Sequence, residues 1–417
     1  MSARKWRGAL ISGLALAAYA MPAAAQEREL LSLEEALSRS GLSESTAETQ
    51  SNPRIVGPRA DTEAAQALVG QARLRPNPEV SFEVENIAGS GAFSGLSATE
   101  YTLSVGQRLE LGGKRSARVQ AAEAQAQLAN VRADLAEAEL GFLVRERYVV
   151  AAAAASRVEL ALDIVERNVE LARIAGVLVE VGREPPLRGL RAQAALAEAR
   201  AELQAAEAAS LAARTALAAL WSDEGAPPVV PSDFPDIVPP STVLVSTTGL
   251  QLQAARAESR AAEAEIDRER SLRVSDPVVS AGVRRFEETN DNAFLVGVSI
   301  PLPFANRNQG NIAAAEARLR AANAREAIAL ADFEQAVTRA RAQYLAAEAR
   351  VETLSATSLP QAEEALRLVR IGYRNGRFPL IEVLSAAEAR DDIREALIAA
   401  QEDQGQAAAE LIRLAAQ

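Results

Sequence analysis

The segment EVSFEVE, residues 79–85, alternates apolar and polar side chains along its whole length. Val80, Phe82 and Val84 stand at every second position, with serine or glutamate between and after them. In a β-strand this period of two places the apolar side chains on one face and the polar side chains on the other. The segment therefore predicts a strand with one apolar and one polar face.

Three further segments show the same alternation, and the four predicted strands cover residues of about 79–86, 99–107, 278–286 and 294–301. Their length fits tilted transmembrane strands, which need about 9 to 11 residues, although a half-buried sheet in a soluble protein has the same pattern. A membrane barrel must close on itself and takes at least about eight strands. If the strands cross a membrane, this chain must share its barrel with further copies.

The chain also carries an internal repeat at an offset of about 193 residues, far longer than the period of a solenoid. In each half a strand pair is followed by a long helix, a turn with Gly and Pro, and a second helix. Residues 109–115, LELGGKR, correspond to residues 302–308, LPFANRN. The turn that begins at Gly182 corresponds to the turn that begins at Gly376.

The helices predicted after the strand pairs are unusually long. No proline interrupts residues 114–181, and at 1.5 Å per residue a helix of that length would reach roughly 100 Å. Apolar and small residues at alternating spacings of three and four, over residues 158–172 and 196–220, predict coiled-coil pairing. The run 310–372 in the second half is comparable, and Pro360 is expected to bend it.

Composition agrees with a mostly helical protein that has no wide core. Of 417 residues 48% are hydrophobic but only 4% are aromatic, and alanine supplies most of the apolar residues. Small side chains at this density favour helices that approach closely along their length. The formal net charge of -11 makes nucleic acid a poor partner.

The expected organisation has four parts. Residues 1–25 combine cations, a short apolar run and an Ala-x-Ala end, which predicts a secretory signal peptide cut before Gln26. Residues 26–221 form the first repeat and residues 249–417 the second. Residues 222–248 form a Pro-rich linker that we expect around the middle of the helical part, where we also expect Ser38 to Pro58.

Residues for catalysis or metal binding are missing. The chain has no Cys and no His, and its two Met residues lie within the signal segment. No nucleophile with a base can be identified, so we expect no enzymatic activity, no cofactor and no metal site. Residues 106–116, GQRLELGGKRS, lack the first glycine and the Ser/Thr of a phosphate loop. Carboxylate pairs such as Asp391-Asp392 are expected to be exposed to solvent.

Four segments together resemble the outer membrane factor family, whose best-known member is TolC, and most closely its CzcC-like heavy-metal branch. They are PNPEVSFEVENIAGSGAFSG (76–95), TLSVGQRLELGGKR (102–115), SIPLPFANRNQG (299–310) and YRNGRFPLIEVLSAAEA (373–389). The first two are typical of the branch and the last two of the wider family. The resemblance extends over nearly the whole chain after the signal segment.

The resemblance implies a mostly α fold with a small β part, in which a homotrimer builds one shared twelve-stranded β-barrel in the outer membrane of a Gram-negative bacterium. A long α-helical barrel would continue it through the periplasm. The implied function is a passive exit channel of a tripartite efflux system of the RND type for cobalt, zinc or cadmium. The implied partners are a periplasmic adaptor and an inner-membrane transporter, and the helical tips would contact the adaptor. These tips are Gly182, Arg183, Glu184, Pro185, Gly376, Arg377, Phe378 and Pro379.

Two alternatives remain open from the sequence. The channel could export drugs or a secreted protein in place of metal ions. Alternatively, the chain could be a soluble periplasmic coiled-coil adaptor, which would explain the heptads and the export signal but leaves the alternating strands without a role.

Overall fold

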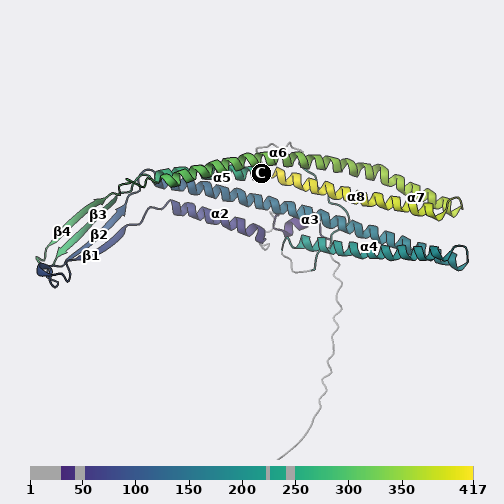
Figure 1. Ribbon diagram of the computed structural model, residues 1–417, viewed down its shortest axis with the longest axis horizontal. Coiled ribbons are helices and arrows are strands. Elements are labelled where there is room, and N and C mark those ends of the chain that lie inside the picture. The colour runs from purple at the N-terminus through teal and green to yellow at the C-terminus, as the bar shows by residue number, and fades with distance from the viewer. Residues whose placement is uncertain (1–29, 43–51, 222–225, 241–248, 417) are drawn as a thin grey trace, which may run out of the picture.

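The computed structural model describes residues 30–42, 52–221, 226–240 and 249–416. The molecule is long and curved, with a small sheet at one end and paired helices over the rest (Figure 1). The helices are α1 (Leu33–Arg39), α2 (Pro53–Ala72), α3 (Lys114–Glu180), α4 (Pro186–Ala218), α5 (Leu250–Ser271), α6 (Gln309–Thr353), α7 (Leu359–Arg374) and α8 (Leu380–Ala415). The strands are β1 (Glu79–Glu85), β2 (Glu100–Arg108), β3 (Val278–Phe286) and β4 (Asn292–Ser299). The predicted signal peptide lies outside the described residues.

The four strands form one antiparallel sheet in the order β1-β2-β3-β4. Its register places Phe82 opposite Leu103, Leu103 opposite Val283, and Val283 opposite Phe294. Apolar side chains from all four strands therefore share one face. They are not covered within the chain: Phe82 is 66% exposed and Phe294 is 90% exposed.

Helix α3 is a single helix of 67 residues. It follows Gly112 and Gly113, whose φ angles are 68° and 74°. At Gly112 a β-carbon would stand 2.6 Å from the Val274 Cγ2 atom, so a glycine is needed for the close approach of the two repeats. With no proline after this turn, α3 runs on from the foot of the sheet to the far end of the molecule (Figure 1).

The corresponding run of the second repeat is interrupted. Helix α6 ends at Thr353, a π-helical turn covers Leu354–Ser358, and α7 begins at Leu359. Pro360 has no N–H to donate to the preceding turn, and the wider π-turn lies directly before it. The effect of Pro360 is thus a local change of helix type within the run 310–372.

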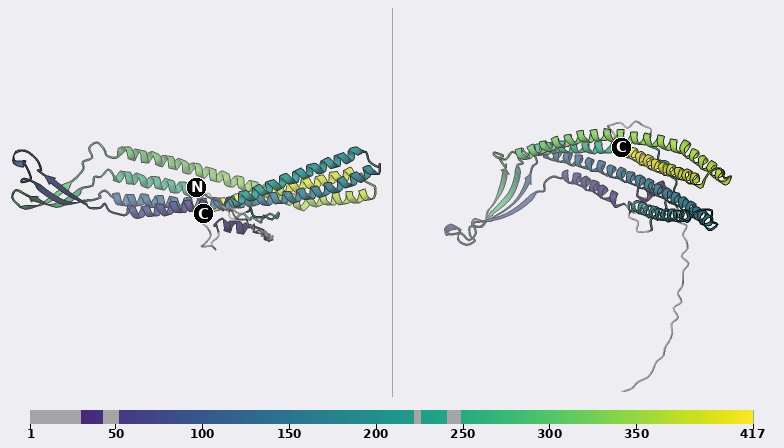
Figure 2. Two further views of the ribbon diagram at one scale, coloured as in Figure 1. Left: turned by 90° about the horizontal axis from the view of Figure 1, so that it is seen from below. Right: turned by 45° about the vertical axis from the view of Figure 1, so that its right-hand side comes forward.

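The helices form a layer one helix thick in two tiers. Near the sheet the neighbours are α2, α3, α5 and α6 in that order, and at the far end they are α4, α3, α8 and α7. The two tiers are twisted relative to each other around the middle of the molecule (Figure 2). Each tier, like the sheet, has two outer elements with a neighbour on one side only.

Around the middle, segments from both ends of the first repeat pack on α3. The Leu31 N–H donates to the Val229 carbonyl at 2.8 Å, and the side chain of Val230 is buried in the same cluster as Val144 and Leu217. The Pro-rich linker therefore packs around the middle of the helical part. On its other side, the Ser156 hydroxyl donates to the Ser232 carbonyl at 2.7 Å.

The stretch Ser38 to Pro58 behaves differently from the linker. Residues 43–51 lie outside the described part, and Pro53 is the first residue of α2, a position that needs no N–H donor. Asn52 caps this helix by accepting from the Arg54 N–H at 3.0 Å, and its side chain donates to the Leu220 carbonyl at 2.7 Å. Residues 53–58 are therefore helical, and Asn52 holds the start of α2 against Leu220.

Tyr148 on α3 holds the N-terminal segment in place. Its hydroxyl donates to the Leu31 carbonyl at 2.8 Å, and the side chain is 2% exposed. Burial raises the pKa of the Tyr148 phenol to about 12, and the charge of Glu34 adds to the rise.

We expect Tyr148→Phe to lower the free energy of unfolding by about 1 kcal/mol at neutral pH, because the buried Leu31 carbonyl loses its donor. The folded chain also holds the phenol proton more tightly than the unfolded chain. The resulting contribution of Tyr148 to the free energy of unfolding is complete below the ordinary pKa of 10.0 and is lost as the pH rises through 12. Denaturant unfolding followed by circular dichroism at neutral pH and at pH values above 10 measures both effects. Tyr373→Phe is the control, and an unaltered pH dependence in Tyr148→Phe would contradict the role of this group.

Candidate functional site

The polar face of the sheet carries the carboxylates. Glu79 and Glu83 of β1 lie on it, opposite Gly106 and Thr102 of β2. Neither glutamate has an ion-pair partner among the described residues. The hydroxyls of Ser81 and Ser104 lie 2.7 Å apart between them. This face is therefore polar and carries negative charge along β1.

At the loop end of the sheet, one cation joins three strands. The Arg284 guanidinium of β3 lies 2.7 Å from a carboxylate oxygen of Glu85 and 2.9 Å from one of Glu100. Its Nε–H donates to the Thr102 hydroxyl at 2.9 Å. The alternation in β3 put Arg284 at a polar position, but only the strand register brings it between two glutamates. Its charge partly neutralises this end of the polar face.

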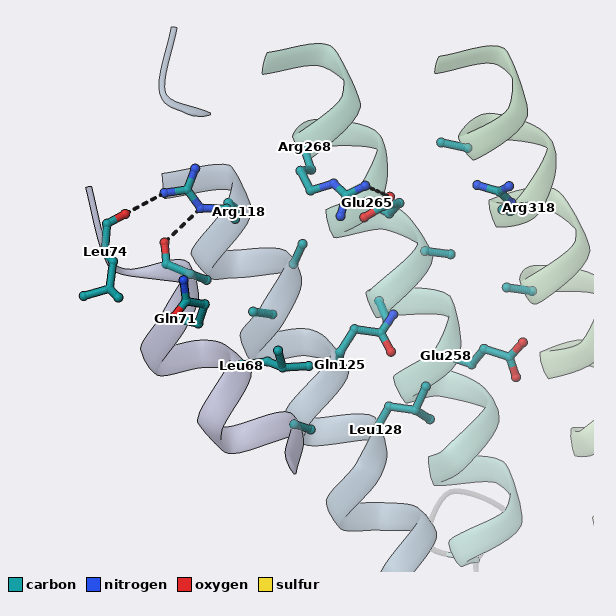
Figure 3. Close-up of a pocket in the computed structure, with 18 of the residues that line it drawn as sticks. Leu68, Gln71, Leu74, Arg118, Gln125, Leu128, Glu258, Glu265, Arg268 and Arg318 are labelled. Carbon is teal, nitrogen blue, oxygen red and sulfur yellow. Dashed lines mark hydrogen bonds and ion pairs between the residues drawn. The ribbon is translucent and has the colours of Figure 1, made fainter. Parts of the chain in front are cut away.

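The helical tier next to the sheet has a concave face. A single cavity of about 1000 Å³ is lined by side chains of α2, α3, α5 and α6, which requires the layer to curve around it. Alanines make up much of its lining, and charged side chains such as Glu258, Glu265 and Arg318 project from neighbouring helices (Figure 3). Burial raises the pKa of the Glu265 carboxyl, although Arg268 lies 2.6 Å away.

The turn between α3 and α4 contains the first set of tip residues. Gly182 has a φ of 71°, and the Arg183 N–H donates to the Leu178 carbonyl at 2.9 Å. Glu184 lies 2.9 Å from Arg188 in an ion pair, and Pro185 precedes the first residue of α4. Glycine provides the left-handed conformation that ends a helix, and proline fits where the next one begins.

The turn between α7 and α8 repeats this geometry at the same end of the molecule (Figure 1). Gly376 has a φ of 70°, the Arg377 N–H donates to the Gly372 carbonyl at 2.8 Å, and Pro379 precedes α8. The turn differs from the first in one respect. The Phe378 ring lies over Gly372, where a β-carbon would stand 2.1 Å from it, yet the ring is 46% exposed.

The two helical hairpins are joined by a buried carboxylate. Asp391 of α8 is 6% exposed and pairs with Arg167 of α3 and with the neighbouring Arg390. The expectation that the Asp391-Asp392 pair is exposed is therefore wrong for Asp391. In the sequence nothing marks this aspartate, because its partner Arg167 lies more than two hundred residues away.

Two kinds of feature do not occur in the part of the chain that the structure describes. No group of three or more His, Cys, Asp or Glu side chains is arranged to hold a metal ion there. Among the described helices, none is both long enough and apolar enough to cross a membrane.

Comparison with known proteins assigns the chain to a family. The family model of the outer membrane efflux protein matches residues 45–222 and 248–417. The cobalt-zinc-cadmium resistance protein CzcC of Cupriavidus metallidurans is 33% identical over 349 residues, which are 81% of this chain and 80% of the relative. The nickel and cobalt resistance protein CnrC of the same species is 35% identical over 66% of each chain.

Solved structures show the same fold at lower identity. A membrane protein from Pseudomonas aeruginosa is 19% identical with a TM-score of 0.76, over 92% of this chain and 90% of that one. CusC is 16% identical with a TM-score of 0.74, over 91% of this chain and 90% of that one. The sequence motifs, the sheet with its long helices and these matches agree: the chain belongs to the outer membrane efflux protein family.

Proposed function

We propose that the chain is one third of the outer-membrane channel of a tripartite efflux system, and that divalent heavy-metal cations leave the cell through it. The observation that carries the proposal is the sheet. One face is continuously apolar and exposed, the opposite face is polar and acidic, and both edge strands lack a neighbour. A sheet of this kind suits a wall between lipid and water.

The outer elements that lack a neighbour on one side support a homotrimer, in which copies of the same chain would cover them. The outer elements at the three levels are β1 and β4, α2 and α6, and α4 and α7. They expose large apolar side chains: Leu68 of α2 is 62% exposed, Ile328 of α6 is 60% exposed and Leu190 of α4 is 64% exposed. Three copies joined edge to edge would pair twelve strands, above the minimum of about eight for a closed barrel.

The cargo is inferred from the relatives and from charge. The similar proteins CzcC and CnrC are named for resistance to cobalt, zinc, cadmium and nickel. In this chain the polar sheet face offers Glu79 and Glu83 without bringing three ligands together. Such a wall attracts cations through its field and does not retain them by coordination. The chain would thus act as a passive channel with no enzymatic step.

The remaining partners are a periplasmic adaptor and an inner-membrane transporter of the RND type, which would drive export. We assign the adaptor contact to the tips, Gly182 to Pro185 and Gly376 to Pro379. Both turns lie together at the end opposite the sheet and present Arg183, Arg377 and a half-exposed Phe378. Exposed charge at such an end steers association with a complementary partner.

Deleting this chain from its host should lower the tolerated concentrations of zinc, cobalt and cadmium, because the exit from the periplasm is lost. Growth in graded metal concentrations, with and without a plasmid copy, measures the effect. Tolerance to drugs is measured in parallel. Unchanged metal tolerance with lowered drug tolerance would refute metal ions as the cargo but would not refute the channel function.

Two charge changes on the polar sheet face should shift ion selectivity in opposite directions. Glu83→Gln removes a negative charge and should lower the preference for cations, whereas Arg284→Gln leaves two glutamates unpaired and should raise it. Each shift should be at most about fivefold, since two unit charges 4 Å apart in water interact by roughly 1 kcal/mol. Reversal potentials in planar bilayers under a salt gradient measure the selectivity. Shifts of the same sign in both variants would contradict a water-filled passage along this face.

Reversing the charge at both tips, Arg183→Glu with Arg377→Glu, should weaken binding to the adaptor and leave the trimer intact. Arg339→Glu on α6, an exposed arginine far from the tips, is the matched control. Co-purification of the adaptor from detergent-solubilised membranes measures binding. Equal adaptor recovery with the double variant and with the control would place the contact elsewhere.

A further inference from the structure

A basic groove lies where the sheet meets the helices. It has a volume of about 1020 Å³ and lies between the end of α2, the end of β2 and the start of α3. Five cations and two carboxylates line it: Arg73, Arg75, Arg108, Lys114, Arg115, Glu110 and Glu123. This excess of positive charge occurs in a chain whose net charge is -11.

The carboxylates nearby are already engaged by other cations. Glu123 lies 2.9 Å from Arg73, Glu110 pairs with Arg118, and Lys114 lies 2.6 Å from Asp276. Three exposed arginines remain, Arg75, Arg108 and Arg115, and none has a carboxylate partner among the described residues. The first turn of α3 adds the positive end of a helix dipole. The groove is therefore suited to a bound anion.

On α3 the groove faces outwards from the curved layer. The concave cavity of Figure 3 is lined on α3 by Arg118, Ala122 and Gln125. The groove is lined on α3 by Ser116, Gln120 and Glu123, which the 3.6-residue period places on the opposite side of the helix, whereas Arg75, Pro76 and Glu110 line both the groove and the cavity. When the layers close around the concave face, the side of the groove on α3 remains on the outside.

The groove also adjoins the apolar face of the sheet. Leu109 lines it and follows Leu103 and Val105 in the alternation of β2, whose pairing continues with the Leu109 N–H bonded to the Pro277 carbonyl at 2.9 Å. Leu74 is 58% exposed and Leu111 is 47% exposed beside it. Apolar side chains therefore line the groove together with its arginines, and Arg108 stands at a polar-face position of β2.

We propose that this groove binds the phosphate head group of an anionic phospholipid in the periplasmic leaflet of the membrane, a proposal that rests on the proposed channel function. Arginine matches phosphate oxygens with paired N–H donors. The adjacent leucines contact the upper acyl chains. The bound lipid fixes the depth at which the apolar sheet face sits in the bilayer.

A second copy of the chain is the competing occupant. In an edge-to-edge trimer its connection between β4 and α6, residues 300–308, would lie nearest to β1 and α2. That connection contains no carboxylate, carries the cation Arg307, and exposes Leu302 and Phe304. Charge complementarity therefore favours a lipid phosphate over this segment.

The test compares the purified full-length channel with the triple variant Arg75→Gln, Arg108→Gln and Arg115→Gln. The control variant removes three other exposed arginines that have no ion-pair partner among the described residues, Arg132, Arg147 and Arg260, also by change to Gln. Each protein is mixed in detergent with equal amounts of phosphatidylglycerol and phosphatidylethanolamine, and native mass spectrometry counts the bound lipids. Millimolar inorganic phosphate is added in a parallel sample.

We expect the unchanged channel and the control variant to retain phosphatidylglycerol in preference to phosphatidylethanolamine. The triple variant should lose this preference by roughly fivefold for each arginine removed, as for a basic side chain at an anionic leaflet. Inorganic phosphate should not displace the lipid. The proposal is overturned if the unchanged channel shows no preference, if the triple variant keeps it, if the control loses it equally, or if inorganic phosphate displaces the lipid.

Bilayer conductance of the same proteins separates this proposal from the channel function. Normal conductance without a lipid preference refutes lipid binding in the groove but not the channel function. A chain that stays monomeric in plain buffer and forms no pore refutes both.

Discussion

The main constraint on this structure is that the backbone N–H and C=O groups along the outer edges of β1 and β4 have no partner strand within the chain. In hydrocarbon each unpaired backbone group costs several kcal/mol, so an open sheet cannot remain in a membrane. The same incompleteness recurs in the helical part, where α2, α6, α4 and α7 offer apolar side chains to a neighbour that this chain does not contain. The proposed edge-to-edge association would satisfy all three levels at once, because the edges of every level lie on the same two sides of the protomer.

Alanine allows the helical wall to be one helix thick. Ala315 of α6 and Ala400 of α8 are fully buried although their side chains are small. At Gly405 of α8 a β-carbon would stand 2.8 Å from the Val149 side chain, so even a methyl group is too large there. Close approach along a great length replaces the thick hydrophobic centre of a globular domain. The few large side chains, such as Leu217 and Tyr148, gather where the N-terminal segment and the linker cross α3.

The sequence predicts those features that depend on local periodicity. Alternation over residues 79–85 predicted β1, and the absence of proline after Gly113 predicted the length of α3. Features that depend on contacts between distant segments could not be predicted from the sequence. The burial of Asp391 depends on Arg167 of another hairpin, and the ion pairs of Arg284 depend on the strand register. Pro53 is the first residue of α2, and the cap at Asn52 that fixes this start also contacts Leu220, far away in the sequence.

The position of Arg284 has a consequence for a cation in transit. Each copy contributes one such arginine at the loop end of the sheet, level with the unpaired Glu83, and a second unpaired glutamate, Glu79, at the end that adjoins the helices. In a threefold ring Glu79 would attract a cation at the entry to the sheet, and at the loop end each Arg284 would offset one of the three carboxylates near it, Glu83, Glu85 and Glu100. The arginine would thus lower the attraction at the outer mouth, and a cation would leave this mouth more readily than it would leave three unpaired carboxylates.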